Sequence, residues 1–160
     1  MSGTPPTLKL WRSFTRKPAG RWMFSKAICF RAPYFSSIRP LVQSLEPGLC
    51  VVQCQKRRAV TNHIGTFHAI AMCNMAELAG GLASEVSVPN SHRWIPAGMS
   101  VEYLAKAETE LTATAQFDIP GSWDDKMTLE TPVEVTDSKG QVVFRARIQM
   151  HVSRKPDRHA

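Results

Sequence analysis

A single helical segment that is apolar on almost every side constrains the fold of this chain more than any other feature. From 67 to 84, apolar residues recur at helical spacing and further apolar residues fill the opposite side. A helix of this kind must be buried. Gly80 and Gly81 inside it allow another backbone to approach closely. The pattern consists of Phe67, Ile70, Ala71, Asn74, Leu78 and Leu82, with Met72, Met75, Ala76 and Ala79 on the other side.

Strand patterns lie before and after this segment. They indicate strands at 41–45, 49–58, 93–105, 110–118, 128–136 and 141–153. A short helix is expected over 21–30, ended by Pro33 and Pro40. Short turns at 46–48 and 137–140 indicate antiparallel pairing. The predicted class is α+β, and the predicted fold is the hotdog fold, a curved antiparallel sheet wrapped around one long central helix.

The length of the chain fits one domain. With 160 residues, of which 43% are hydrophobic and 21% charged, it can bury a stable core without disulfides or a structural metal. Pro5, Pro6, Pro18 and Gly20 interrupt the start of the chain, which has few apolar anchors. We therefore predict a basic, flexible N-terminal arm over residues 1–20 and a single hotdog domain over residues 21–155.

The net positive charge is confined to the start of the chain. Residues 1–45 contain eight Lys or Arg and no acid, whereas the remainder has twelve basic and thirteen acidic residues. Three interpretations stay open: a solvated arm and helix, a region that attracts an anionic ligand such as coenzyme A, or a targeting-like or nucleic-acid-binding segment. No nucleic-acid-binding motif follows it, so nucleic acid is not the expected partner.

The cysteines give no sign of disulfides or zinc. All four lack CxxC pairing and zinc spacing. Cys50 and Cys54 are four positions apart in a strand pattern, so they should share one face as reduced, buried thiols. We expect no metal and no cofactor. A reducing compartment, the cytoplasm, is expected, with organelle targeting by the basic N-terminus left open. No apolar run reaches the roughly 20 residues of a membrane span.

A polar loop before the long helix has the residue types of a reactive site. It contains Asn62, His63, Gly65 and Thr66. The first N–H groups of a helix lack intrahelical acceptors and carry the positive end of the helix dipole. Such an end can bind an anion or a developing oxyanion. Thr66 is the predicted N-cap.

Glu77 is the second chemically distinctive residue. It lies mid-helix among apolar neighbours, where a carboxylate is costly unless it is hydrogen-bonded or functional. It follows His68 by nine positions, which places the two on opposite sides of the helix and about 13 Å apart along it. One helix cannot bring Glu77 to its own N-terminus, but two antiparallel copies can. The spacing therefore predicts a two-fold dimer with composite sites, and a tetramer of two dimers stays open.

The segment resembles the signature of hotdog-fold thioesterases of the phenylacetate-pathway type, Asn-x-x-Gly-(small or Thr)-x-His-Gly-Gly followed by an acid on the central helix. The matching residues are Asn62, Gly65, Thr66, His68 and Glu77. Residues 100–107 resemble the family's strand and Tyr-x-x-Pro-Ala turn, with Lys106 in place of proline. The resemblance covers roughly residues 40–153. It is nearest to the poorly characterised branch related to the C-terminal domain of certain acetyltransferases.

The resemblance implies hydrolysis of an acyl-CoA or acyl-carrier-protein thioester. The N–H of Ala69, which follows the motif residue His68, would polarise the thioester carbonyl. Glu77 of the neighbouring subunit would activate water or attack directly, and Asn62 would orient the acid or the water. The family's Gly-Gly is Ala69-Ile70 here, which keeps the N–H but crowds the pocket. The predicted substrate contacts are Gly65, Thr66, Ile70, Asn74 and Tyr103.

Structural interpretations stay open for the same residues. His68 can be a hydrogen-bonded structural histidine, Asn62 an Asx-turn residue, and Glu77 an ion-paired or interface acid. The alternative function is a non-catalytic hotdog domain that binds a CoA-linked or fatty-acyl ligand. A dehydratase-type hotdog uses a His/acid pair that is placed differently, and this sequence shows no clear match to it.

Overall fold

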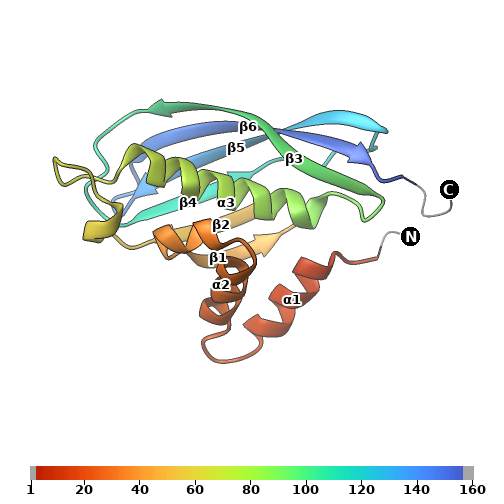
Figure 1. Cartoon of the computed structure of the whole chain (residues 1–160), viewed down its shortest axis with the longest axis horizontal. Coiled ribbons are helices and arrows are strands. Elements are labelled where there is room, and N and C mark those ends of the chain that lie inside the picture. The colour runs from red at the N-terminus through yellow and green to blue at the C-terminus, as the bar shows by residue number, and fades with distance from the viewer. Residues whose placement is uncertain (1–2, 157–160) are drawn as a thin grey trace.

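Within the range that the computed structural model describes, residues 3–156, six strands and three α-helices form the protein (Figure 1). The strands are β1 (Leu41–Glu46), β2 (Leu49–Cys54), β3 (His92–Tyr103), β4 (Leu111–Gln116), β5 (Lys126–Asp137) and β6 (Val142–Arg154). The helices are α1 (Pro6–Thr15), α2 (Gly20–Arg31) and α3 (Ala69–Ser87), with short 3-10 turns η1 (Pro33–Ile38) and η2 (Arg58–Val60).

The strands form one antiparallel sheet in the order β1-β2-β4-β5-β6-β3. The sheet curves around α3, which lies along its inner face (Figure 1). The predicted α+β class and hotdog fold are confirmed. The strand that follows the central helix, β3, lies at the edge of the sheet and pairs with β6 rather than with β4, its neighbour in sequence.

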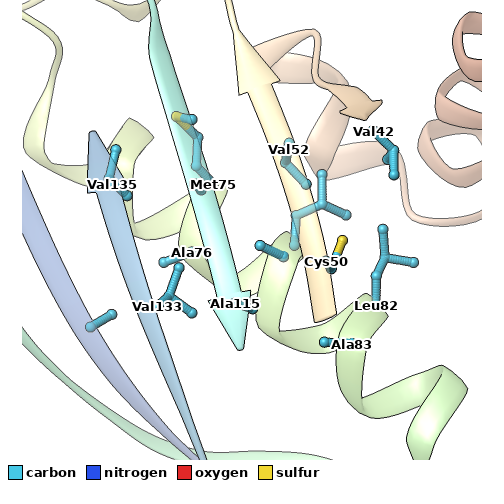
Figure 2. Close-up of a cluster of buried hydrophobic side chains, with 14 of the residues drawn as sticks. Val42, Cys50, Val52, Met75, Ala76, Leu82, Ala83, Ala115, Val133 and Val135 are labelled. Atoms are coloured by element: carbon cyan, nitrogen blue, oxygen red, sulfur yellow. The ribbon is translucent and has the colours of Figure 1, made fainter. Parts of the chain in front are cut away.

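The helix α3 is buried because the strands present an apolar inner face to it. On β6 the inward residues are Phe144, Ala146, Ile148 and Met150, which are all almost completely buried, as their alternation in sequence predicts. Figure 2 shows the centre of this core, where Met75 and Ala76 of α3 lie against residues of β2, β4 and β5. The labelled strand residues are Val42, Cys50, Val52, Ala115, Val133 and Val135.

The helix approaches the sheet closely at Gly80. A Cβ atom at this position would lie 2.8 Å from Cδ1 of Ile148 and 3.2 Å from Cγ2 of Thr131. Gly81 faces the other way, and a Cβ atom there would lie 3.2 Å from the Trp94 ring. The two glycines therefore accommodate side chains of the strands that flank α3, rather than a second backbone.

The prediction of a flexible arm over residues 1–20 is wrong for the part of it that the structure describes. Half of the predicted arm, residues 6–15, forms α1, and its apolar residues Leu8 and Trp11 are buried. The ring of Trp11 packs edge-on against Phe24 of α2 at a centroid distance of 5.0 Å. Pro6 occupies the first turn of α1, where proline starts a helix rather than breaking one. We call residues 6–31, which comprise α1 and α2, the helical hairpin.

The cysteines are all free. Cys50 and Cys54 lie on the buried face of β2, as predicted. Burial disfavours the thiolate and raises the pKa of Cys54 to about 12, and it raises the pKa of Cys50 further. Of the helices in the described range, none has both the length and the apolarity to cross a bilayer.

The packing of the helical hairpin predicts a contrast between two neighbouring residues. Trp11→Ala should lower the free energy of unfolding by about 3 kcal/mol, because it removes a buried ring from its contact with Phe24. Leu10→Ala, at an exposed position of the same helix, should cost about 0.5 kcal/mol or less. Urea unfolding monitored by circular dichroism measures both. Equal, small effects would mean that α1 is not docked.

Candidate functional site

The loop that leads into α3 is organised by Asn62. Its side-chain Oδ1 accepts hydrogen bonds from the N–H groups of Ile64 and Thr66, each at 3.1 Å, and its Nδ2 donates to Oγ1 of Thr66 at 2.8 Å. Gly65 has a φ of 80°, which glycine adopts without strain. The backbone bonds Phe67 N–H to Ala107 O and His68 N–H to Val60 O, both 2.8 Å, then fix the entry to the helix.

The N-cap of α3 is His68, so the prediction of Thr66 in that role is wrong. The Nδ1 atom of His68 accepts a hydrogen bond from the N–H of Ile70 at 3.1 Å. Thr66 is instead buried and held by Asn62. The physical reason is that the extended segment runs two residues further than the sequence pattern suggests, because Phe67 and His68 are bonded to other loops.

The N–H of Ala69 remains available at the positive end of α3. It makes no hydrogen bond to any residue within 3–156, whereas the next N–H, that of Ile70, is satisfied by His68. Ala69 lines an open hollow of about 390 Å³ together with Asn62, Thr66 and Tyr103. The structure therefore brings four of the predicted site residues together. The rest of the lining comes from Phe67, Met72, Leu104, Ala105, Lys106 and Ala107.

Glu77 is exposed in the single chain, which corrects the expectation of a carboxylate in an apolar interior. The apolar residues beside it in sequence are buried, whereas Glu77 lies on a stripe of α3 that is not fully buried. This stripe consists of Cys73, Glu77, Gly81 and Glu85, spaced four residues apart. Glu77 is eight residues from Ala69, about 12 Å along the helix. It does not line the hollow at the helix N-terminus.

A second cavity, of about 350 Å³, runs beside Glu77. Its walls are mostly apolar and come from α2, η1, α3 and β3. One end is closed by Glu85, which accepts hydrogen bonds from Nε1 of Trp94 at 2.9 Å and from Oγ1 of Thr7 at 3.2 Å. We call this cavity the α3 groove. Its other lining residues include Ile28, Arg31, Phe35, Leu78, Leu82 and Pro96.

The remaining predicted contacts lie in different surroundings. Asn74 is buried and donates from Nδ2 to Oγ of Ser37 at 3.1 Å, so it faces η1 and not the exposed stripe. Ile70 is 55% exposed beside Ala69. Oη of Tyr103 lies 3.5 Å from Sγ of Cys73, and this contact is the main reason that the pKa of Tyr103 is raised. No cluster of His, Cys, Asp and Glu within residues 3–156 could hold a metal ion.

The comparisons with known proteins agree with this fold. The family model described as "Domain of unknown function (DUF4442)" matches residues 20–152. The chain belongs to this family. No curated protein matches the sequence significantly. The solved structure named genomics APC5556 is 44% identical to this DUF4442 chain, with a TM-score of 0.79, and the match covers 93% of this chain and 99% of that one.

Two more distant structures carry names that refer to thioesterases. PA5026 from Pseudomonas aeruginosa, described as a protein of unknown function and probable thioesterase, is 20% identical with a TM-score of 0.70, over 77% of this chain and 88% of that one. Thioesterase HI1161 from Haemophilus influenzae is 12% identical with a TM-score of 0.67, over 79% of this chain and 87% of that one. At these identities the likeness establishes the hotdog fold of this DUF4442 chain.

The α3 groove was missed by sequence reasoning, although part of its signal was present. Cys73, Glu77, Gly81 and Glu85 are small or polar residues at every fourth position of an otherwise apolar helix, which marks one uncovered stripe. The residues from α2 and β3 that complete the groove carry no such signal, because their proximity to α3 arises from the tertiary fold.

The Asn62 network predicts a graded loss of stability. Asn62→Ala should lower the free energy of unfolding by about 2 kcal/mol, because it leaves the N–H groups of Ile64 and Thr66 without their acceptor. Asn62→Asp should cost less, since it keeps both acceptor bonds and the hydroxyl of Thr66 can turn to donate. Thermal unfolding of both variants measures the difference. Equal losses would show that the acceptor bonds do not hold the loop.

Proposed function

We propose that this DUF4442 protein hydrolyses acyl-thioesters, of CoA or of an acyl-carrier protein, in composite sites between two copies of the chain. The observation that carries the proposal is the Ala69 N–H at the positive end of α3, which has no acceptor within residues 3–156 and belongs to a residue that lines an open hollow. An N–H in this position can stabilise the oxyanion that forms when a thioester carbonyl is attacked. The thioesterase names of PA5026 and HI1161 are consistent with it.

The acid must come from a second copy, because Glu77 of the same chain is about 12 Å further along the helix. The edge strand β3 supports such pairing. Within the described chain it pairs only with β6, so the outward-pointing backbone groups of this twelve-residue strand are open to another strand. The apolar side chains of Met99 and Tyr103 are exposed beside it. An exposed apolar edge of this length favours association with an identical edge about a two-fold axis.

The chemical step follows from these positions. The Ala69 N–H and the dipole of α3 draw electron density towards the carbonyl oxygen. Glu77 of the partner subunit then accepts a proton from water while the water oxygen attacks the carbonyl carbon, or its carboxylate attacks directly and water cleaves the resulting anhydride. In both routes the carbon–sulfur bond breaks. In the first route the departing thiolate takes the proton that Glu77 accepted from water, and in the second it leaves as the anhydride forms and is protonated by the water that then cleaves the anhydride. Asn62 holds the loop that borders the hollow.

The acyl chain of the substrate fits the α3 groove. The groove begins beside Glu77, has mostly apolar walls, and ends at the Glu85–Trp94 hydrogen bond. Glu77 and Glu85 are eight residues apart, about 12 Å along the helix, which suits an extended acyl chain of medium length. Burial of each methylene in such a groove contributes about 0.8 kcal/mol. An apolar acyl group of this kind is therefore the proposed substrate class.

One observation favours the alternative of a non-catalytic domain that binds a CoA-linked or fatty-acyl ligand. The side chain of Ile70 is more than half exposed immediately after the Ala69 N–H, where the thioesterase signature has glycine. A bulky side chain there crowds the approach of a thioester. A panel of acyl-CoAs tests this alternative. Binding of acyl-CoA in calorimetry, with no thiol released from any of them in a separate assay, would support it.

Ala69→Pro tests the role of the N–H alone. Proline is tolerated at the first position of a helix, and His68 before it already has φ −67° and ψ 136°, which proline requires of the preceding residue. In an assay that measures thiol release from acyl-CoA, the kcat of the variant should fall by about 10²–10³-fold. Ala69→Gly keeps the N–H and should retain activity. Similar rates in the two variants would contradict oxyanion stabilisation at this site.

Mixing two inactive variants tests the composite site. Glu77→Gln should lower kcat by about 10²–10⁴-fold, while Glu130→Gln on the opposite face of the sheet should not. If each site combines Ala69 of one chain with Glu77 of the other, Ala69→Pro and Glu77→Gln chains unfolded and refolded together should regain about a quarter of the wild-type rate, through mixed dimers with one intact site. Light scattering should show a dimer. A monomer, or no recovery on mixing, would refute the composite site.

A further inference from the structure

The helical hairpin displays an unbalanced charge on a folded surface. All eight Lys and Arg residues that precede residue 46 are exposed, and none of them forms a salt bridge with a described residue. The first acidic residue of the chain is Glu46. Seven of the eight basic residues lie in the helical hairpin, and the eighth, Arg39, follows η1. Because α1 and α2 are docked helices and not a flexible arm, the backbone positions that carry the seven charges are fixed. The residues are Lys9, Arg12, Arg16, Lys17, Arg21, Lys26, Arg31 and Arg39.

The same surface exposes large apolar side chains. Trp22, Lys26 and Phe30 follow one another at intervals of four on α2, and with Met23 they span an arc of roughly 100°. Trp22 is 57% exposed and Phe30 is 90% exposed. The ammonium of Lys26 lies 5.7 Å from the Trp22 ring centroid. Tyr34, just beyond the end of α2, is 69% exposed. Aromatic side chains this exposed are unusual on a surface that contacts water alone.

The helical hairpin turns the exposed arc of α2 away from the α3 groove, whose lining includes Ile28 and Arg31 on the other side of that helix. It is attached to β1, where Oγ of Ser25 accepts a hydrogen bond from the N–H of Val42 at 2.9 Å and Arg21 donates to Gln43 at 3.1 Å. The strands β1 and β3 are the two opposite edges of the sheet. Figure 1 shows α1 and α2 projecting below the sheet. A large flat partner can therefore contact the hairpin while β3 stays accessible.

We propose that the helical hairpin binds the surface of membranes that contain anionic lipids. Trp22 and Phe30 enter the interfacial region, where aromatic side chains are favoured, and the surrounding cations contact the headgroups. Charge complementarity identifies the lipid, because the helical hairpin carries seven cations and no acid, which matches a surface of negative headgroups. The exposed Phe30 distinguishes this partner from a nucleic acid or an acidic protein, which charge alone would attract. The proposal does not depend on thioester hydrolysis.

Vesicle flotation with the full chain tests the proposal. The protein should float with vesicles of equal parts phosphatidylcholine and phosphatidylglycerol, remain unbound with phosphatidylcholine alone, and be released as sodium chloride is raised. Each Lys or Arg near an anionic surface strengthens binding by roughly fivefold. Lys26→Glu, which changes the charge by two, should therefore weaken vesicle binding by more than tenfold. Phe30→Ser should weaken it by about fivefold or more.

Two matched controls separate the hairpin from the rest of the surface. Lys139→Glu changes an exposed lysine in the β5–β6 turn, and Ile119→Ser changes an exposed apolar residue in the β4–β5 loop. Both should bind vesicles like the unaltered protein. Equal losses in the controls, or equal binding to neutral vesicles, would overturn the proposal. Displacement of the protein from vesicles by a duplex oligonucleotide or an acidic carrier protein would also overturn it. The same holds if the hairpin variants bind vesicles normally and change only the oligomeric state in light scattering.

Discussion

The burial of one apolar helix is the interaction on which the rest of the structure depends. The inner face of α3 has almost no polar side chains, so it is stable only when a sheet covers it. The sheet approaches closely because the facing positions are small: Gly80 on the helix, and Ala113, Ala115 and Ala146 on the strands. This packing also fixes where α3 begins. The loop held by Asn62 and the cap made by His68 then leave Ala69, whose N–H has no acceptor within residues 3–156, in the wall of a hollow.

A curved sheet covers a helix on one side only, and the uncovered stripe of α3 is where the candidate chemistry lies. Glu77 occupies that stripe, with the α3 groove beside it and the open edge of β3 along the groove. The single chain therefore holds two separate parts of a site, an N–H donor at one end of the helix and an exposed acid about 12 Å away. In the proposed dimer, association through β3 would unite the two parts and enclose a carboxylate that is exposed in the single chain. The proposed function therefore needs the dimer for two reasons: to bring the acid to the N–H donor, and to bury the acid.

In the helical hairpin, tertiary packing determines how the basic residues of the sequence are arranged on the surface. Seven cations in a flexible segment would have no fixed arrangement and no preferred partner. Docking of Trp11 on Phe24 orders the same residues into helices, and the residues left outside the contact then form a cationic and aromatic surface. The charges are a property of the sequence, but their arrangement beside Trp22 and Phe30 is a property of the fold.

The sequence alone determined the central helix, the strands of the sheet and the loop that carries the candidate site. Periodicity identified α3 and the six strands to within a few residues, and the spacing of Asn62, Gly65, His68 and Glu77 identified the resemblance, because these signals are local. Tertiary structure decided what depends on distant partners: the pairing of β3 with β6, the cap at His68 instead of Thr66, the burial of Asn74 and the exposure of Glu77. It also turned the expected arm into α1, since Leu8 and Trp11 form a helix face only when α2 is present to cover it. Local patterns specify which faces are apolar, and only the fold specifies which of those faces are covered.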